Sequence, residues 1–346
     1  MTRILHIHFG KEGGAERFFV SLCQALHDRG IEQHFLIRPG RSWLSEVQQL
    51  GTVRQVHYPR IWLVRKWLAA WVRRLEKRWC PDAIIAWMPK ATTLLPASSK
   101  AARLIRLGDY PRHVKHFRNC DCIVTNTPDI PNRLRDLGWD KPVKVISNFP
   151  RTGETGGEAP IISFNQNLFV VCGVGRFVKL KGFDTLIKAV ALLPDVGLCL
   201  VGDGEERIAL ETLASNLGIA DRVMITGWVS DPTKWLASTD VACVTSTHET
   251  LGNVVLEAWL CNVPVISTPT LGPSWLLAEQ KSGILLDNHS PEKLAKAIAR
   301  LRDDPALRDK LIAQGATKLK KEFSRDSIVD AYLSAIDTHK SKELGL

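Results

Sequence analysis

The sequence predicts an α/β protein of two domains, each built around a doubly wound parallel β-sheet. The chain has 346 residues, which is too long for one ordinary hydrophobic core and suits two. Hydrophobic residues make up 45% and charged residues 24%, so the chain can bury a core and lacks the charge excess typical of disorder. Short apolar runs alternate with segments of helical periodicity from end to end, which is the pattern of βα units.

The predicted strands are apolar runs without polar alternation, as expected when helices cover both faces of a sheet. In the first half they span residues 3–8, 32–37, 83–87, 102–107 and 121–125. In the second half they span residues 169–174, 197–201, 222–226, 241–244 and 264–267. A helix is expected to begin at Pro291, because Ser290 can cap it and Glu292 lies in its first turn.

The two halves are joined by a stretch with the composition of a linker. Residues 151–160 are rich in Gly, Thr and Pro and have no periodicity. We therefore predict a first domain at 1–150, a linker at 151–165 and a second domain at 166–325. A terminal helix at 326–346 is expected to pack back toward the first domain.

The net charge indicates an acidic partner and lies in the first half. The chain carries a formal charge of +10, which favours nucleic acid, an anionic membrane or phosphorylated small molecules. Residues 1–150 contain 25 Lys and Arg against 12 Asp and Glu, whereas the remainder contains 21 against 24. The first half also holds seven of the eleven Trp residues.

Part of this charge lies in residues 58–80, where seven Lys or Arg accompany a single acid, Glu76. Two interpretations of this segment remain open. It is either a cationic amphipathic helix on an anionic membrane surface, or a helix that packs its Trp stripe on the first sheet. The apolar residues that recur at helical spacing are Val64, Trp67, Leu68, Trp71, Leu75 and Trp79.

Cysteine and histidine patterns argue against disulfide and metal chemistry. The eight cysteines form no Cys-x-x-Cys pair and mostly lie in apolar runs, which is typical of reduced core residues in a cytosolic protein. The pairs His6/His8 and His113/His116 lack a clustered carboxylate or Cys partner, so no metal site is expected. No signal peptide or apolar run of 18 residues is apparent, and we expect a cytoplasmic protein.

The most informative segment follows the predicted strand at 241–244. If a helix begins near Gly252, Glu249 lies in the loop before it and Glu257 on its first turns, where both can hold one extended ligand. Small residues and a helix N-terminus suit a phosphate group, as in the binding of a nucleotide sugar. The alternative is that Glu249 only caps the helix and Glu257 is only a solvated residue. The apolar residues around Glu257 favour a functional site.

Two further loops follow first strands. After the strand at 169–174, Arg176 and Lys181 can neutralise a diphosphate, although basic residues at such turns are often only solvated. After the strand at 3–8, Gly13 and Gly14 allow close approach of the backbone to a ligand, or form a bare tight turn. The segment that begins with Gly173-Val174-Gly175 has Val at position 178, where a dinucleotide-binding motif has its third Gly, and the sequence contains no P-loop. Both observations disfavour dehydrogenase and ATPase activities.

These motifs together resemble glycosyltransferase family 4. In the second half, the resemblance is nearly continuous from residue 169 to 290. In the first half, it is found mainly in the opening loop. It implies a GT-B fold of two Rossmann-like domains and retaining transfer from a nucleotide-diphosphate sugar, with no metal or other cofactor. The motifs are Gly13-Gly14-Ala15-Glu16-Arg17, Gly175-Arg176 with Lys181-Gly182, Gly202-Asp203-Gly204, and Glu249-x-x-Gly252-x-x-x-x-Glu257-Ala258.

Position by position, the resemblance also implies roles. Arg176 and Lys181 would stabilise the leaving diphosphate, Glu249 would meet the donor sugar hydroxyls, and Glu257 the ribose. The acceptor hydroxyl would then attack from the side that the diphosphate leaves. The remaining residues implied in substrate binding are Gly13, Gly14, Gly175, Gly202, Thr250, Leu251, Gly252 and Asn253.

The sequence departs from the family in three places. The usual histidine near the end of a first-domain strand is missing, and Asp109 is the nearest polar candidate for a catalytic role. Asn262 replaces a glycine after the glutamate helix, which is a mild change because Asn tolerates the left-handed conformation of a helix end. Trp275 replaces a common acidic residue.

We expect an enzyme that transfers a sugar to a hydroxyl of a lipid-linked or lipopolysaccharide-type acceptor. The first domain would be the acceptor side, and residues 58–80 would attach the protein peripherally to the inner face of the cytoplasmic membrane. A nucleotide-sugar epimerase or hydrolase of GT-B fold is the nearest alternative. A basic nucleic-acid-binding protein is disfavoured, because it leaves Glu249 and Glu257 unexplained and no nucleic-acid module is visible.

Overall fold

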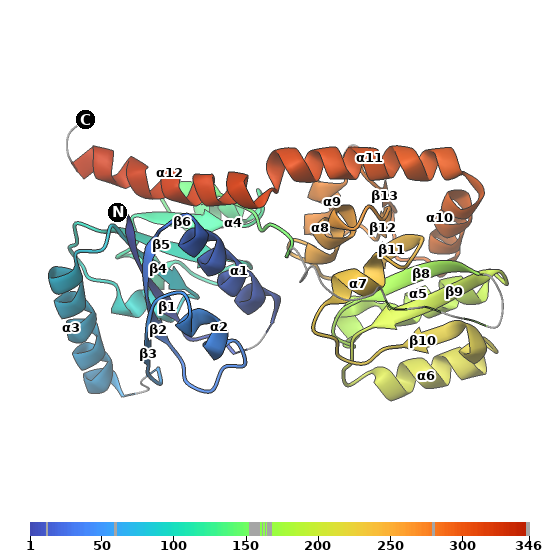
Figure 1. The fold of residues 1–346 in the computed structure, drawn as a ribbon, viewed down its shortest axis with the longest axis horizontal. Helices are drawn as coiled ribbons and strands as arrows, with labels where there is room; N and C mark the ends of the chain where they lie inside the picture. Colours follow the sequence, from blue (N-terminus) through green and yellow to red (C-terminus); the bar gives the residue numbers. More distant parts are fainter. Residues whose placement is uncertain are drawn as a thin grey trace. The chain divides into compact units, whose positions relative to one another are not determined.

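The chain forms two compact units in a computed structural model (Figure 1). Unit 1 consists of Met1–Phe149 and Arg325–Leu346, and unit 2 of Pro150–Ser324. The structure describes residues 1–11, 13–58, 61–151, 160, 162, 164, 168–278 and 281–343, with side chains as far as 338. Most of the predicted linker at 151–165 lies outside the described residues.

Unit 1 contains a seven-stranded parallel sheet of order β3-β2-β1-β4-β5-β6-β7. Its core has one layer on each face of the sheet, with α1, α2 and α12 on one side and α3, α4 and the two short 3-10 helices on the other. The strands are β1 (Arg3–His8), β2 (Glu32–Ile37), β3 (Thr52–Gln55), β4 (Ala83–Trp87), β5 (Ala102–Leu107), β6 (Cys122–Thr125) and β7 (Val143–Val145). The helices are α1 (Gly14–Asp28), α2 (Leu44–Gln48), α3 (Trp62–Trp79), η1 (Ala91–Leu94), η2 (Lys115–Phe117), α4 (Ile130–Asp136) and α12 (Arg325–Glu343).

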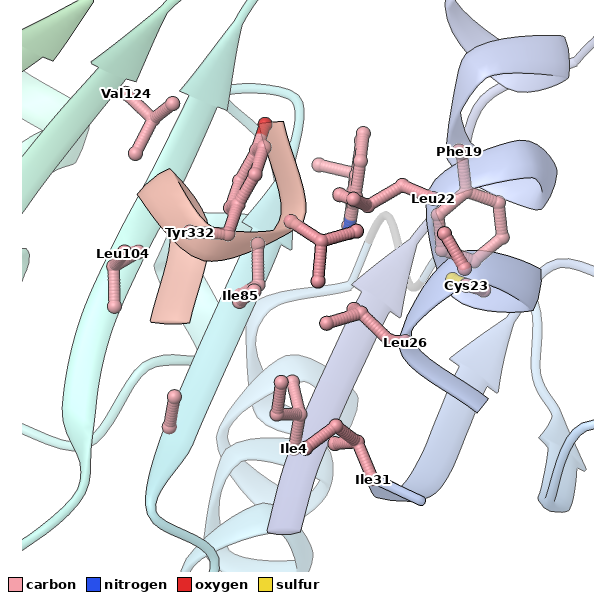
Figure 2. Close-up of a cluster of buried hydrophobic side chains, with 14 of the residues drawn as sticks. Ile4, Phe19, Leu22, Cys23, Leu26, Ile31, Ile85, Leu104, Val124 and Tyr332 are labelled. Carbon is pink, nitrogen blue, oxygen red and sulfur yellow. The ribbon is translucent and has the colours of Figure 1, made fainter. Parts of the chain in front are cut away.

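The C-terminal helix α12 is an integral part of unit 1, although unit 2 precedes it in the chain. Tyr332 of this helix is fully buried in the core, and Figure 2 shows its ring beside Val124, Leu104 and Ile85 of the sheet. At the surface, Arg29 forms ion pairs with Asp326 at 2.9 Å and Asp330 at 3.1 Å.

Unit 2 contains a six-stranded parallel sheet of order β10-β9-β8-β11-β12-β13. Helices α5, α6 and α10 cover one face and α7, α8 and α9 the other, while α11 contributes to both layers. The strands are β8 (Phe169–Val174), β9 (Val196–Val201), β10 (Val223–Ile225), β11 (Val241–Val244), β12 (Val265–Ser267) and β13 (Ile284–Leu285). The helices are η3 (Lys179–Lys181), α5 (Phe183–Ala191), α6 (Arg207–Asn216), η4 (Ala220–Arg222), α7 (Pro232–Leu236), α8 (Asn253–Leu260), α9 (Leu271–Leu276), α10 (Pro291–Asp303) and α11 (Pro305–Glu322).

All ten predicted strands are present, with ends that differ from the prediction by no more than one residue. Among the described residues, the sequence missed β3, β7 and β13, which are short and largely exposed or half-buried and therefore give no apolar run. The predicted start of α10 is confirmed, because Pro291 is its first residue and the Ser290 hydroxyl accepts from the backbone N–H of Lys293 at 3.3 Å.

Strand order reverses between β1 and β4 in unit 1 and between β8 and β11 in unit 2. In doubly wound sheets, ligands bind at the carboxyl ends of the strands where the order reverses. The loops at these positions are 9–13 and 88–90 in unit 1, and 175–182 and 245–252 in unit 2. The Gly13-Gly14 turn therefore lies at the switch point of the sheet of unit 1. The loops that carry Arg176, Lys181 and Glu249 lie at the equivalent switch point of the sheet of unit 2.

The histidine pair His6/His8 belongs to the core of unit 1. The indole N–H of Trp87 donates to Nδ1 of His6 at 3.2 Å, and Nε2 of His6 contacts Gln33 at 3.1 Å. Burial lowers the pKa of His6 and of His8 to about 3, so both rings are neutral. No group of three or more His, Cys, Asp or Glu in the described part of the chain is arranged to hold a metal ion.

Helix α3 is packed along only part of its length. Leu68 and Val72 are buried, and Trp71 and Trp79 are half-buried against the sheet. In the first turns, the apolar side chains of Trp62, Leu63, Val64 and Trp67 are exposed, with Trp62 at 52% and Trp67 at 60% exposure, whereas Arg65 is half-buried. The core interpretation of the Trp stripe is therefore confirmed for Leu68, Trp71 and Trp79, and the membrane interpretation of the exposed first turns stays a prediction. None of the helices within the described ranges is long and apolar enough to span a membrane.

Candidate active site

In unit 2, the loops that follow β8 and β11 interlock. The backbone N–H of Thr247 donates to the carbonyl of Leu180 at 2.9 Å, and the Thr245 hydroxyl donates to the carbonyl of Lys181 at 2.9 Å. Gly182 has φ 63°, and a Cβ there would lie 2.3 Å from the carbonyl oxygen of Thr245. A side chain at position 182 would therefore force the two loops apart.

This interlock brings Lys181 and Glu249 together. Nζ of Lys181 donates to Oε2 of Glu249 at 2.5 Å, and the Ser246 hydroxyl donates to the same oxygen at 3.1 Å. Both charged side chains are half-buried. The pair thus presents a positive and a negative group side by side, and each of them still reaches the surface.

Helix α8 begins beside this pair, and no side chain caps its N-terminus. Gly252 caps it with φ 86°, and no acidic residue lies in its first turn. The preceding loop is fixed by α9, because the N–H of Gly272 donates to the carbonyl of Glu249 at 3.1 Å. A Cβ on Gly272 would lie 2.3 Å from the carbonyl oxygen of Leu251. The partial positive charge of a helix N-terminus is a favourable place for a phosphate.

Glu257 lies on the second turn of α8 and is half-buried. The residues that the structure describes give its carboxylate no hydrogen bond. The pKa of Glu257 is raised to about 7, chiefly by burial; Arg151 and Lys181 oppose the rise, and Asp231 and Glu249 add to it. An unsatisfied carboxylate of this kind is a candidate for binding hydroxyl groups.

Two glycines hold the loop after β8 close to its neighbours. Gly175 has φ 150°, and a Cβ there would lie 3.4 Å from Cε of Lys181. Gly202 has φ 139°, and a Cβ there would lie 2.0 Å from the carbonyl oxygen of Gly175. Between them, Arg176 is exposed and forms no ion pair with any described residue, so its guanidinium is available to a ligand.

The structure thus gathers most of the predicted site residues in unit 2. Thr250, Leu251, Gly252 and Asn253 continue from Glu249 into the start of α8. The other predicted residues lie in unit 1. Asp109 is exposed in the loop after β5, where its carboxylate accepts from the N–H of Tyr110 at 2.8 Å. Gly13 caps α1 and Gly14 is its first residue.

Two of the departures from the family pattern have structural explanations. Asn262 has φ 57° at the end of α8, which confirms that it takes the left-handed conformation expected there. The ring of Trp275 packs against that of Phe323, with centroids 5.6 Å apart. This side chain therefore takes part in hydrophobic packing, unlike the acidic side chain that it replaces.

The sequence prediction missed the residues that support the site. Thr245 and Ser246 bind Lys181 and Glu249 directly, and Gly272 fixes the loop between Glu249 and α8. A signal was available, because two small polar residues follow a buried strand at the carboxyl edge of a parallel sheet. Gly272 gives no comparable signal, since it belongs to a helix that the motifs do not include.

Comparisons with known proteins agree with this geometry. Residues 12–152 match the family model described as Glycosyltransferase Family 4, and residues 158–318 match that of Glycosyl transferases group 1. Two curated relatives are the lipopolysaccharide core biosynthesis glycosyltransferases LpsE and LpsD of Rhizobium meliloti (strain 1021). Each is 44% identical to this chain. The match to LpsE covers 96% of this chain and 98% of LpsE, and the match to LpsD covers 98% of this chain and 99% of LpsD. The chain belongs to glycosyltransferase family 4.

The fold of this family 4 glycosyltransferase is GT-B, as solved structures also indicate. The crystal structure of a glycosyltransferase from Rickettsia africae ESF-5 superposes with a TM-score of 0.84, at 17% identity and 98% coverage of each chain. Anabaena Alr3699/HepE in complex with UDP and glucose gives a TM-score of 0.79, at 20% identity, covering 98% of this chain and all of that one. The expected fold class and the expected enzyme class are both confirmed.

Proposed function

We propose that this glycosyltransferase moves a sugar from a nucleotide-diphosphate donor to a hydroxyl group of a lipid-linked or lipopolysaccharide-type acceptor. The observation that carries the donor part is the Lys181–Glu249 pair beside the N-terminus of α8. A diphosphate needs positive charge, and a sugar needs groups that accept from its hydroxyls. Both lie within one loop pair at the carboxyl edge of the sheet of unit 2.

In this proposal, each residue has the role that the resemblance to glycosyltransferase family 4 implies, and its charge and exposure are compatible with that role. Arg176 and Lys181 neutralise the diphosphate as it leaves, together with the backbone N–H groups at the start of α8. Glu249 accepts from the donor sugar hydroxyls, and Glu257 from the ribose. Gly175 and Gly202 keep the backbone close enough for these contacts. Asp109 remains a candidate for a catalytic role on the acceptor side.

Retention and metal independence are also part of the proposal. Two cationic side chains and a helix N-terminus can offset the charge of a diphosphate without a divalent ion. Attack by the acceptor hydroxyl from the side that the diphosphate leaves would retain the anomeric configuration. Product analysis by NMR should show the donor's anomeric configuration, and turnover should persist in excess EDTA. An inverted product or complete loss in EDTA would contradict these two points.

The proposed acceptor rests on the two relatives that are named as lipopolysaccharide core enzymes. The exposed start of α3 supports attachment to the inner face of the cytoplasmic membrane. Trp62, Leu63 and Trp67 are exposed there beside Lys66 and other cations, which is the composition of a helix that binds an anionic interface. This attachment would bring unit 1 to an acceptor that carries a lipid.

The donor and acceptor can be tested in sequence. A panel of nucleotide sugars is screened by thermal shift, because a ligand that binds the folded state raises its apparent stability. The best donor is then incubated with lipopolysaccharide-type and lipid-linked acceptors and, separately, without an acceptor. Transfer only in the presence of acceptor supports the proposal. Rapid epimerisation or hydrolysis that an acceptor does not change would favour the epimerase or hydrolase alternative.

The membrane part can be tested with vesicles. Co-sedimentation with anionic vesicles at low salt is expected for the wild type and should fall at least severalfold in a Trp62→Ala/Trp67→Ala variant. Trp228→Ala is the matched control, because Trp228 is 68% exposed on unit 2. Equal loss in the control, or no preference for anionic lipid, would overturn this part. Tight filter binding of nucleic acid at physiological salt would instead favour the nucleic-acid alternative.

A further inference from the structure

The peptide unit between Ser246 and Thr247 connects the loops at the carboxyl edge of the sheet of unit 2. Its N–H, which belongs to Thr247, donates to the carbonyl of Leu180 in the loop after β8, at 2.9 Å. Its carbonyl oxygen, which belongs to Ser246, accepts from the Thr268 hydroxyl at 2.8 Å and lies 3.2 Å from Nε2 of His289. Thr268 follows β12 and His289 follows β13, so side chains from two further strands hold the loop after β11.

His289 is the donor in its contact with Ser246. A carbonyl oxygen can only accept a hydrogen bond, so Nε2 of the ring carries the proton. The ring is half-buried, and Ser246 is only 2% exposed. Removing the ring would therefore take a donor from a buried carbonyl oxygen, which costs free energy.

The loop that carries His289 is fixed at both ends. The N–H of Leu286 donates to the carbonyl of Ser267 at 2.8 Å, which joins the start of the loop to β12. At the other end, the N–H of Ser290 donates to Oδ1 of Asn288 at 3.0 Å, and Ser290 caps α10. The imidazole therefore reaches the peptide unit from a well-supported backbone.

Holding this peptide unit orients both Lys181 and Glu249. A peptide unit is planar and trans, so fixing its oxygen also directs its N–H toward the carbonyl of Leu180, which precedes Lys181. The Ser246 hydroxyl donates to Oε2 of Glu249 at 3.1 Å, so the same residue also supports the carboxylate. Hydrogen bonds in such a chain strengthen one another. His289 thus acts on both charged groups through one peptide unit.

We propose that His289 is a positioning residue for sugar transfer, which holds Lys181 and Glu249 in the arrangement that the reaction needs. The proposal rests on the proposed function, which assigns this pair to the donor. A different role for His289 would be to stabilise only the loop between β13 and α10. The two roles can be separated, because positioning requires a hydrogen-bond donor at the place of Nε2, whereas loop stability alone does not.

The test measures kcat and the donor KM of His289→Ala and His289→Gln in the full-length protein. Misplacement of Lys181 and Glu249 should lower the kcat of His289→Ala by about tenfold or more. The donor KM should change by less than about threefold, because the loss falls on the transition state. The amide nitrogen of glutamine can donate from nearly the place of Nε2, so the kcat of His289→Gln should recover to within about threefold of the wild type.

Asn288→Ala is the matched control. It removes the hydrogen bond to Ser290 within the same loop but leaves the donor to Ser246 in place. Its kcat should stay within about twofold of the wild type, and urea unfolding should show that every variant is folded in the assay. An equal loss of kcat in Asn288→Ala, or no recovery in His289→Gln, would mean that His289 acts only on loop stability and would overturn the inference.

A double-mutant cycle tests whether His289 acts through the charged pair. In the Lys181→Met/Glu249→Gln background, His289→Ala should lower kcat by less than about a further twofold, because the groups that it positions are gone. A further loss of about tenfold in that background would overturn the inference. Normal turnover by the wild type with an unaffected His289→Ala would reject the inference alone, whereas failure of the wild type to use any nucleotide sugar would reject the proposed function as well.

Discussion

Nζ of Lys181 lies 2.5 Å from Oε2 of Glu249, which is 68 residues away in the sequence. The contact forms because Gly182 lets the loop after β8 pack on the backbone of the loop after β11. If the pair acts as one unit on the donor, its members should be coupled in catalysis. Lys181→Met and Glu249→Gln should each lower kcat by about 100-fold or more.

The double variant Lys181→Met/Glu249→Gln measures this coupling. Residues that act as a unit show strongly non-additive effects, so the double variant should be little worse than the poorer single variant. Steady-state kcat values of the four proteins complete the cycle. Strict multiplication of the two single effects would mean that the groups act independently, contrary to this prediction.

Gly182 should tolerate alanine much less well than another glycine with the same backbone conformation. Gly182 has φ 63° and Gly218 has φ 69°, but a Cβ on Gly218 would meet nothing within 4 Å. Gly218→Ala should therefore cost only the left-handed backbone penalty of about 1–2 kcal/mol in the free energy of unfolding. Gly182→Ala should cost more and also reduce kcat, because it displaces Thr245. Urea unfolding and turnover of both variants are the measurements, and equal behaviour would argue against the interlock.

Glu257 should make the stability of unit 2 depend on pH. Its pKa in the folded protein is about 7, above the ordinary value for glutamate, so the folded state holds the proton more tightly than the unfolded state. The protonated carboxyl of Glu257 therefore contributes to the free energy of unfolding. This contribution is fully present below the ordinary glutamate pKa and is lost as the pH rises through about 7. Glu257→Gln stays neutral and should remove this loss. The measurement is the free energy of unfolding of both proteins between pH 5 and 8.5. If this free energy fell with pH in the variant as steeply as in the wild type, the prediction would be refuted.

The sequence predicted the fold well because its strands are continuous apolar runs, such as Val241–Val244, bounded by loop residues. The positions of the charged candidate site residues were also predictable, since Arg176, Lys181 and Glu249 follow such strands. The contacts that position them were not. Whether Lys181 reaches Glu249 depends on the crossover order of β8 and β11, which no local pattern encodes.

His289 illustrates the same limit. The sequence places it directly before the Ser290 cap of α10, but its hydrogen bond to Ser246 depends on the pairing of β12 with β11 and β13. Likewise, the Trp stripe of α3 predicted a helix, and only packing could show that Leu68 is buried while Trp67 is exposed. Tertiary context, rather than periodicity, decided both cases.

The proposed mechanism depends on stabilisation of the departing diphosphate by the cationic loop of unit 2. The most direct measurement is kcat for sugar transfer in Arg176→Ala and Lys181→Ala, with Lys179→Ala as the control, because Lys179 is an exposed cation of the same loop. We predict a loss of about 100-fold or more in the first two variants and less than about threefold in the control, with all three folded. Near-normal turnover in Arg176→Ala and Lys181→Ala would contradict this mechanism.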